Sequence, residues 1–226
     1  MDALEAIRSR RSIGRLVEPA PSDAELTTIL GAAACAPDHG GLRPFRFTVL
    51  RGGNMGAFGA VMADAYRRRC AAAGVEPAEA KVAKEAAKLQ RAPLVVVASV
   101  VRGPTDRIPW VEQLASGAAA CQNALLAATA LGYGSMWRTG DACYDPLVRA
   151  ALGLGPDDAA VAFLYLGTAT PSARAARPPR DPDLAGLVRD WAPPRGPGPG
   201  RRRRAGAQPS WPRSAPSGNS SLWTLT

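Results

Sequence analysis

This chain of 226 residues has one histidine and no C-x-x-C pair. The single histidine, His39, argues against a histidine-dependent hydrolase, and neither a catalytic triad nor a paired-carboxylate site stands out. The four cysteines are scattered without a C-x-x-C pair, which predicts reduced thiols and no metal site. These cysteines are Cys35, Cys70, Cys121 and Cys143.

Long apolar runs and leader sequences are missing as well. No apolar stretch reaches 18 residues, so we expect no membrane span. The first residues are acidic and amphipathic, unlike a signal peptide, and therefore predict a cytoplasmic protein. Neither Gly52-Gly53 nor Gly132-Tyr133-Gly134 forms a Rossmann fingerprint or a P-loop, so a nucleotide would be bound without those motifs.

Positive charge is abundant but unevenly distributed. The formal net charge is +9, and six arginines lie after residue 191, which leaves about +3 for residues 1–191. Hydrophobic residues make up 46% of the chain, enough for a buried core. We predict one folded domain over residues 1–191 and a disordered tail rich in proline, glycine and arginine over 192–226.

Hydrophobic periodicity and capping signals predict alternating helices and strands. The expected helices cover residues 2–9, 54–73, 76–89 and 110–131, with one that begins at the capping box of Ser22 and ends before Pro37 and a short one from 145. The expected strands cover residues 45–50, 94–101, 133–137 and 161–167. This order indicates an α+β fold with one central sheet.

Two short segments carry candidate binding residues. Arg10-Arg11-Ser12 places two guanidiniums and a hydroxyl at the end of the first predicted helix, a combination suited to binding a phosphate. Ala36-Pro37-Asp38-His39 places the histidine in a turn stiffened by proline.

Together with further motifs, these segments resemble the nitroreductase family, in particular its small NAD(P)H nitroreductase subgroup. The matching pieces extend over residues 1–191, roughly 85% of the chain, and their order and spacing make the set specific. They are Met1-Asp2-Ala3-Leu4-Glu5, Arg10-Arg11-Ser12, Glu18-Pro19-Ala20-Pro21, Ala36-Pro37-Asp38-His39, Arg91-Ala92-Pro93-Leu94, Trp137-Arg138 and Phe163-Leu164-Tyr165-Leu166-Gly167-Thr168.

The resemblance implies a mixed or antiparallel central sheet flanked by helices, in a homodimer with two FMN sites at the subunit interface. The residues implied as FMN contacts are Arg10, Arg11, Ser12, His39, Trp137, Arg138 and Thr139. The resemblance also implies, less specifically, that a second segment contacts the nicotinamide cofactor. Its residues are Ala127, Ala128, Thr129, Ala130, Leu131 and Gly132.

The implied activity is an FMN-dependent oxidoreductase. NADH or NADPH would reduce the flavin at N5, and a nitroaromatic, a quinone or a similar electron-poor acceptor would then be reduced in a ping-pong cycle. No side chain need act as an acid or a base. One alternative is a flavin-dependent oxidase or desaturase of a specialised metabolite. Another is nucleic-acid binding through Arg201-Arg202-Arg203-Arg204, although the run lacks interleaved aromatic residues.

One position departs from the subgroup. The subgroup tends to have an arginine before Ala-Pro-Asp-His, and this chain has Cys35 there. The substitution removes one implied cofactor contact. We hypothesise that Arg43 restores the missing positive charge from a nearby position.

Overall fold

The computed structural model describes residues 1–105, 107–176 and 182–192. The chain divides into a compact unit, Met1–Pro182, and a second unit that begins at Asp183. Residues 193–226, which include almost all of the predicted tail and its arginine run, lie outside the described residues. The predicted boundary at residue 191 therefore stays a prediction.

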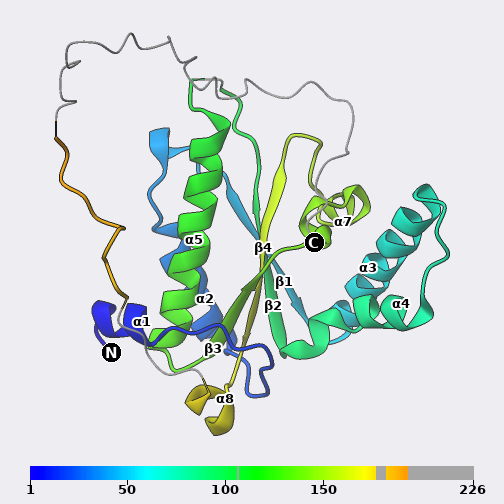
Figure 1. The fold of residues 1–226 in the computed structure, drawn as a ribbon, viewed down its shortest axis with the longest axis horizontal. Coiled ribbons are helices and arrows are strands. Elements are labelled where there is room, and N and C mark those ends of the chain that lie inside the picture. Colours follow the sequence, from blue (N-terminus) through cyan, green and yellow to red (C-terminus); the bar gives the residue numbers. More distant parts are fainter. Residues whose placement is uncertain (106, 177–181, 193–226) are drawn as a thin grey trace, which may run out of the picture. The chain divides into compact units, whose positions relative to one another are not determined.

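A four-stranded sheet forms the centre of the first unit (Figure 1). Its strands are β1 (Phe45–Arg51), β2 (Leu94–Val100), β3 (Gly134–Arg138) and β4 (Ala159–Gly167), in the spatial order β1-β2-β4-β3. All three pairings are antiparallel. The prediction of an α+β fold around one central sheet is confirmed.

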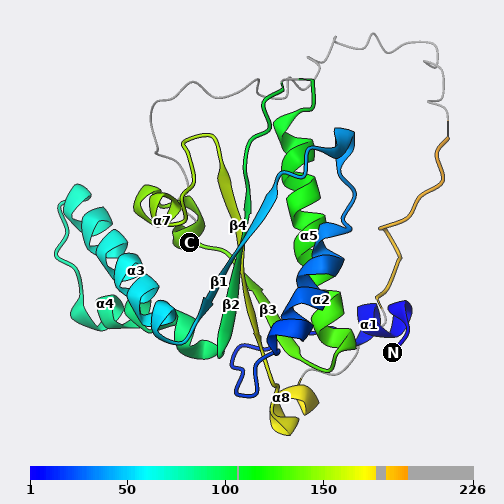
Figure 2. The same ribbon diagram turned by 180° about the vertical axis from the view of Figure 1, so that it is seen from behind.

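Both faces of the sheet are covered, because its central strands are apolar on both sides. Along β2, Val95 and Val97 belong to one hydrophobic cluster, whereas Val96 and Ala98 belong to the other. Helices α1 (Ala3–Ser9), α2 (Asp23–Ala34) and α5 (Trp110–Ala130) lie on one side in both views (Figures 1 and 2). Helices α3 (Gly53–Ala72), α4 (Glu79–Ala86) and α7 (Pro146–Ala151) lie on the other.

Local capping explains where several helices begin. The Ser22 hydroxyl accepts the Glu25 N–H at 3.3 Å, and the Glu25 carboxylate accepts the Ser22 N–H at 2.9 Å, so the predicted capping box is present. Asp2 caps α1 by accepting the Glu5 N–H. These side chains satisfy amide groups that a helix start leaves without partners.

The predicted helix over residues 76–89 is wrong in its bounds. Helix α4 begins at Glu79 and ends at Ala86, and a separate 3₁₀ turn covers Lys88–Arg91. Glu76 precedes Pro77, whose ring disfavours the helical conformation of the residue before it. The sequence patterns also missed α6 (Asp141–Tyr144) and α8 (Pro171–Ala175), which are too short to show periodicity.

Helix α5 packs closely on the sheet because small residues line its inner face. A Cβ atom added at Gly117 would lie 2.3 Å from Cγ2 of Val100, so only glycine allows this approach. Ala120, Cys121 and Ala124 continue the buried side. Within the described ranges, no helix is long and apolar enough to cross a membrane.

Candidate functional site

The segment Arg10–Ser12 lies beside the edge strand of the sheet. Arg10 terminates α1, and Ser12 forms a parallel bridge with Ser135 of β3. The Ile13 N–H donates to the Ser135 carbonyl oxygen at 3.0 Å. This pairing places Arg10–Ser12 next to the strand that continues into Trp137-Arg138-Thr139, although more than 120 residues separate the two segments in the sequence.

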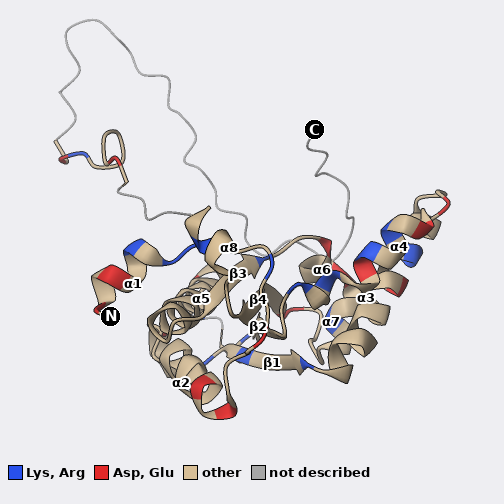
Figure 3. Ribbon diagram, turned by 90° about the horizontal axis from the view of Figure 1, so that it is seen from below, with Lys and Arg blue, Asp and Glu red and all other residues tan. Residues whose placement is uncertain are grey.

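Positive charge is concentrated at the end of α1 and in the segment that follows it (Figure 3). Burial, and secondly the charge of Arg11, lower the pKa of Arg10 below its ordinary value. The Arg11 guanidinium donates to the Arg10 carbonyl oxygen at 2.6 Å. An anionic group placed here would relieve their repulsion, so the segment fits a phosphate.

Arg138 ends β3 with a buried donor. Its Nε atom and the Ser135 hydroxyl are buried and have no hydrogen-bond partner within the described part of the chain. Burial raises the pKa of the neighbouring Tyr165 to about 12, against the opposing charges of Arg138 and Arg91. Unsatisfied buried donors are uncommon in proteins, and a ligand with acceptor atoms would satisfy the one on Arg138.

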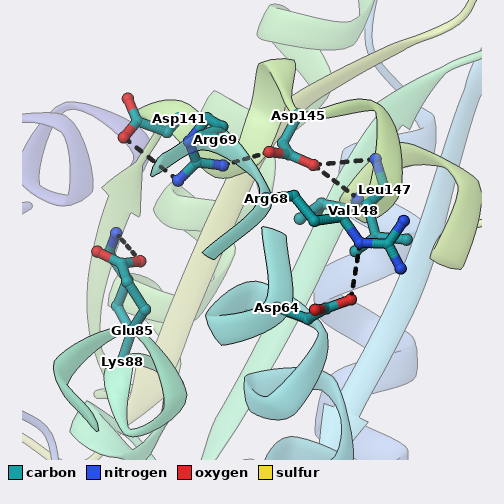
Figure 4. Close-up of polar contacts among 9 residues, drawn as sticks. All are labelled: Asp64, Arg68, Arg69, Glu85, Lys88, Asp141, Asp145, Leu147 and Val148. Atoms are coloured by element: carbon teal, nitrogen blue, oxygen red, sulfur yellow. Dashed lines mark hydrogen bonds and ion pairs between the residues drawn. The ribbon is translucent and has the colours of Figure 1, made fainter. Parts of the chain in front are cut away.

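The polypeptide after Arg138 is anchored by buried charge. Asp145 is 4% exposed, forms an ion pair with Arg69 of α3, and accepts the N–H groups of Leu147 and Val148 at the start of α7 (Figure 4). Arg69 also lies 3.6 Å from Asp141 in α6. These contacts fix α6 and α7 to α3, and so fix the position of the turn that leaves the predicted site.

Several residues of the predicted nicotinamide segment, residues 127–132, pack in the core or form hydrogen bonds within the protein. Ala128 is fully buried in the core between α5 and the sheet, and the Thr129 hydroxyl donates to the Leu125 carbonyl oxygen at 2.8 Å. Gly132 ends the helix with a φ of +89°, and its carbonyl oxygen accepts from Arg174. Exposed atoms are thus confined mainly to Ala130, Leu131 and Gly132.

A small cavity adjoins this segment. It has a volume of about 170 Å³, and Arg11, Thr129, Tyr133 and Arg174 are among its lining residues. The sequence patterns did not single out Tyr133 or Arg174 as binding residues. Arg174 follows the last strand in a short helix, and only the folded chain brings its guanidinium to Gly132.

His39 lies elsewhere in the protomer. It begins a 3₁₀ turn, His39–Gly41, and its Nδ1 donates to Oε2 of Glu112 at 2.5 Å. Glu112 is in the first turn of α5, whereas Thr129 is in the last. The 17 residue steps from Glu112 to Thr129 span about 25 Å at the helical rise of about 1.5 Å per residue. Within one protomer, His39 and Arg10–Ser12 are therefore too far apart to contact the same mononucleotide.

Cys35 and Arg43 flank the histidine turn. Cys35 ends α2, is exposed, and lines a groove of about 410 Å³ together with Met1, Ile7 and other residues of α1 and α5. Arg43 has a φ of +47°, and its N–H donates to Oδ2 of Asp38 at 2.5 Å. The suggested charge replacement by Arg43 stays a prediction.

Comparison with known proteins establishes the family. The family model described as "Nitroreductase family" matches residues 7–168. The chain belongs to the nitroreductase family. The expectation of a nitroreductase-type enzyme is therefore confirmed at the level of the family.

Relatives and solved structures agree with this assignment. The chain is 38% identical over 168 residues to "Putative NAD(P)H nitroreductase YdjA" of Escherichia coli K12, covering 74% of this chain and 88% of the relative. It is 31% identical over 169 residues to "Putative NAD(P)H nitroreductase" of Haemophilus influenzae, covering 74% of this chain and 89% of that protein.

Two crystal structures have the same fold. The nitroreductase-like protein of Bacillus cereus superposes with a TM-score of 0.69 at 19% identity, covering 84% of this chain and 96% of that one. A nitroreductase of Bacteroides fragilis, solved with bound FMN, gives 0.63 at 23% identity, covering 85% of this chain and 100% of that one. The predicted nitroreductase-like fold is confirmed.

Proposed function

We propose that this nitroreductase family member is a homodimeric, FMN-dependent oxidoreductase that uses NADH or NADPH to reduce electron-poor acceptors such as nitroaromatics and quinones. Support comes from the family, from relatives named NAD(P)H nitroreductases and from the FMN in the Bacteroides fragilis structure. The observation that carries the cofactor assignment is that the basic segment Arg10–Ser12 pairs with β3 at Ser135, on the strand that ends in Arg138, whose buried Nε lacks a partner among the described residues.

The chain's own residues would bind FMN in two groups. Arg10, Arg11 and Ser12 hold its phosphate, because guanidinium groups and a hydroxyl match phosphate oxygens. Arg138 supplies a donor from the end of β3, beside Trp137 and Thr139. The chemistry that bound FMN would supply is hydride transfer, from the nicotinamide in one half-reaction and to the acceptor in the other.

A second copy of the chain would complete each site. Because His39 is about a helix length from Arg10–Ser12 in one protomer, we assign the contact with each FMN to His39 of the partner subunit. An apolar surface is available for that association. Leu4 and Ile7 of α1 are 67% and 51% exposed, and the groove between α1 and α5 lies beside them.

Without a Rossmann fingerprint, the dinucleotide and the acceptor would use one pocket over the flavin in turn, as a ping-pong cycle requires. The segment 127–132 offers mainly backbone groups and the exposed residues Ala130 and Leu131 to the nicotinamide. The chain's residues in this proposal bind and orient, and none transfers a proton.

The experiment is an absorption spectrum of the purified full chain, followed by identification of any released chromophore and by anaerobic titration with NADH and NADPH. We expect flavin absorption bands, released FMN, and bleaching on addition of a nicotinamide. A colourless protein that takes up no added FMN would contradict the cofactor assignment. An FMN protein that neither nicotinamide bleaches would instead favour the oxidase or desaturase alternative.

A further inference from the structure

The only histidine of the chain lies in a turn with an unusual backbone. Gly40, Gly41 and Arg43 have φ values of +73°, +66° and +47°. Residues with a side chain rarely adopt this left-handed region of the backbone, and Arg43 is such a residue. The Asp38 backbone and side chain stabilise the turn, since the Gly41 N–H donates to its carbonyl oxygen at 3.2 Å and the Arg43 N–H to its carboxylate. Such backbone conformations persist where surrounding contacts enforce them.

The turn rests on a second loop that α5 holds in place. A Cβ atom added at Gly40 would lie 2.5 Å from Cδ1 of Ile108, so the two loops are in close contact. Gln113, which is 2% exposed, accepts the Gly103 N–H at 2.8 Å and donates to the Ile108 carbonyl oxygen at 3.0 Å. The first turn of α5 thus fixes the base on which the histidine turn lies.

The residue before Gln113 contacts the histidine itself. Glu112 accepts from Nδ1 of His39 at 2.5 Å, while the imidazole remains 64% exposed. A carboxylate on Nδ1 makes that nitrogen the donor, fixes the ring orientation and leaves Nε2 directed away from the pair. An exposed histidine without such a partner would sample several rotamers.

We propose that Glu112 is a positioning residue, which holds the His39 imidazole so that Nε2 is presented to the FMN of the neighbouring site. The inference rests on the proposed function, because the ligand of Nε2 is the proposed FMN. Glu112 does not itself touch the cofactor. Its effect on FMN binding is therefore expected to pass entirely through His39.

The first test measures the pair without cofactor. Because the chain has one histidine, the imidazole ¹⁵N signals of the full-length protein belong to His39 without further assignment. We expect Nδ1 to carry the proton in the wild type, and Glu112→Ala to produce a mixture of the two neutral tautomers. Identical ¹⁵N shifts in the wild type and Glu112→Ala would overturn the proposal.

The second test measures FMN affinity in a double-mutant cycle. We expect Glu112→Ala to weaken FMN binding roughly fivefold, the scale of one exposed charge pair. In a His39→Ala background, the same change is expected to leave the affinity as it is, because the residue acts through the ring. Glu79→Ala, which removes an exposed glutamate 3.9 Å from Arg67, is the matched control and should bind FMN as the wild type does.

The outcomes separate the two levels of inference. Equal, additive losses in both backgrounds would show that Glu112 acts without His39 and would refute the positioning role. If Glu112→Gln, which keeps an acceptor for Nδ1, fails to restore any of the affinity lost in the alanine variant, orientation is also refuted. A wild type that binds no FMN, with the expected imidazole signals, would contradict the proposed function while leaving the contact between Glu112 and His39 intact.

Discussion

We predict that the buried carboxylate of Asp145 stabilises the segment that follows Arg138, and that its removal lowers the free energy of unfolding. Its carboxylate is 4% exposed, caps α7 through the N–H groups of Leu147 and Val148 at 2.9 and 3.3 Å, and pairs with Arg69. Asp145→Ala removes both functions. Loss of the cap costs about 1 kcal/mol. Loss of the charged hydrogen bond to Arg69 costs a further 1–3 kcal/mol or so, less than for a fully buried pair because Arg69 is 35% exposed.

Two further variants separate the contribution of the helix cap from that of the charge interactions with Arg69. Asp145→Asn keeps an acceptor for the helix cap but loses the charge, and we expect a loss of about 1–2 kcal/mol. Asp141→Ala removes the other carboxylate near Arg69. Because Asp141 is 73% exposed and 3.6 Å from Arg69, its removal should cost no more than about 0.5 kcal/mol.

The assay is urea denaturation followed by tryptophan fluorescence, with every variant at one protein concentration because dimerisation would couple to stability. The expected order of stability is wild type, Asp141→Ala, Asp145→Asn and Asp145→Ala. If Asp145→Ala were no less stable than Asp141→Ala, the buried carboxylate would not be an anchor. If Asp145→Asn were as unstable as Asp145→Ala, the helix cap would contribute nothing.

Three further predictions concern packing, alkaline stability and charge. In α3, Gly59→Ala should destabilise the protein by about 1–3 kcal/mol in urea, because the new Cβ would lie 2.1 Å from the Ala86 carbonyl oxygen. Gly56→Ala in the same helix meets nothing within 4 Å and should stabilise it by up to about 1 kcal/mol; the opposite order would refute the close packing of α3 on α4. Burial raises the pKa of Cys143 to about 11 and that of Cys121 to about 12, above the ordinary 9.0, so the unfolded chain loses these protons first as pH rises. The free energy of unfolding should therefore fall from about pH 9 upward by as much as about 1.4 kcal/mol per pH unit for each thiol. Urea midpoints across this range should decline less steeply in a Cys121→Ala, Cys143→Ala double variant, and an equal decline would count against the assignment. Arg43→Ala should weaken FMN binding roughly fivefold if Arg43 replaces the charge missing at Cys35, measured by fluorescence titration against Arg51→Ala as the control. Equal affinities would dismiss the compensation.

Much of the secondary structure is determined by local sequence. The capping box at Ser22 and Glu25 and the helix start at Asp145 follow from side chains three residues or fewer from the amide groups they satisfy. The apolar run Leu94–Val100 forms a strand, as its short length and its valine-rich composition predict. Where local signals were weak, as around Pro77 and in the four-residue helix Asp141–Tyr144, the predicted bounds failed or the element was missed.

For the candidate site as well, the sequence indicates some features and only the folded chain shows the others. The motif order of residues 1–191 identified the family and singled out Arg10–Ser12 and His39 as candidate binding residues. Only the folded chain shows that Ser12 pairs with Ser135, that Arg138 keeps a buried donor without a partner in the described region, and that Glu112 holds His39 from 73 residues away. These contacts depend on strand order and on the length of α5, which no short sequence window contains. The sequence by itself therefore determined the chemistry of the candidate binding residues, and the tertiary structure decided which of them one protomer can bring together.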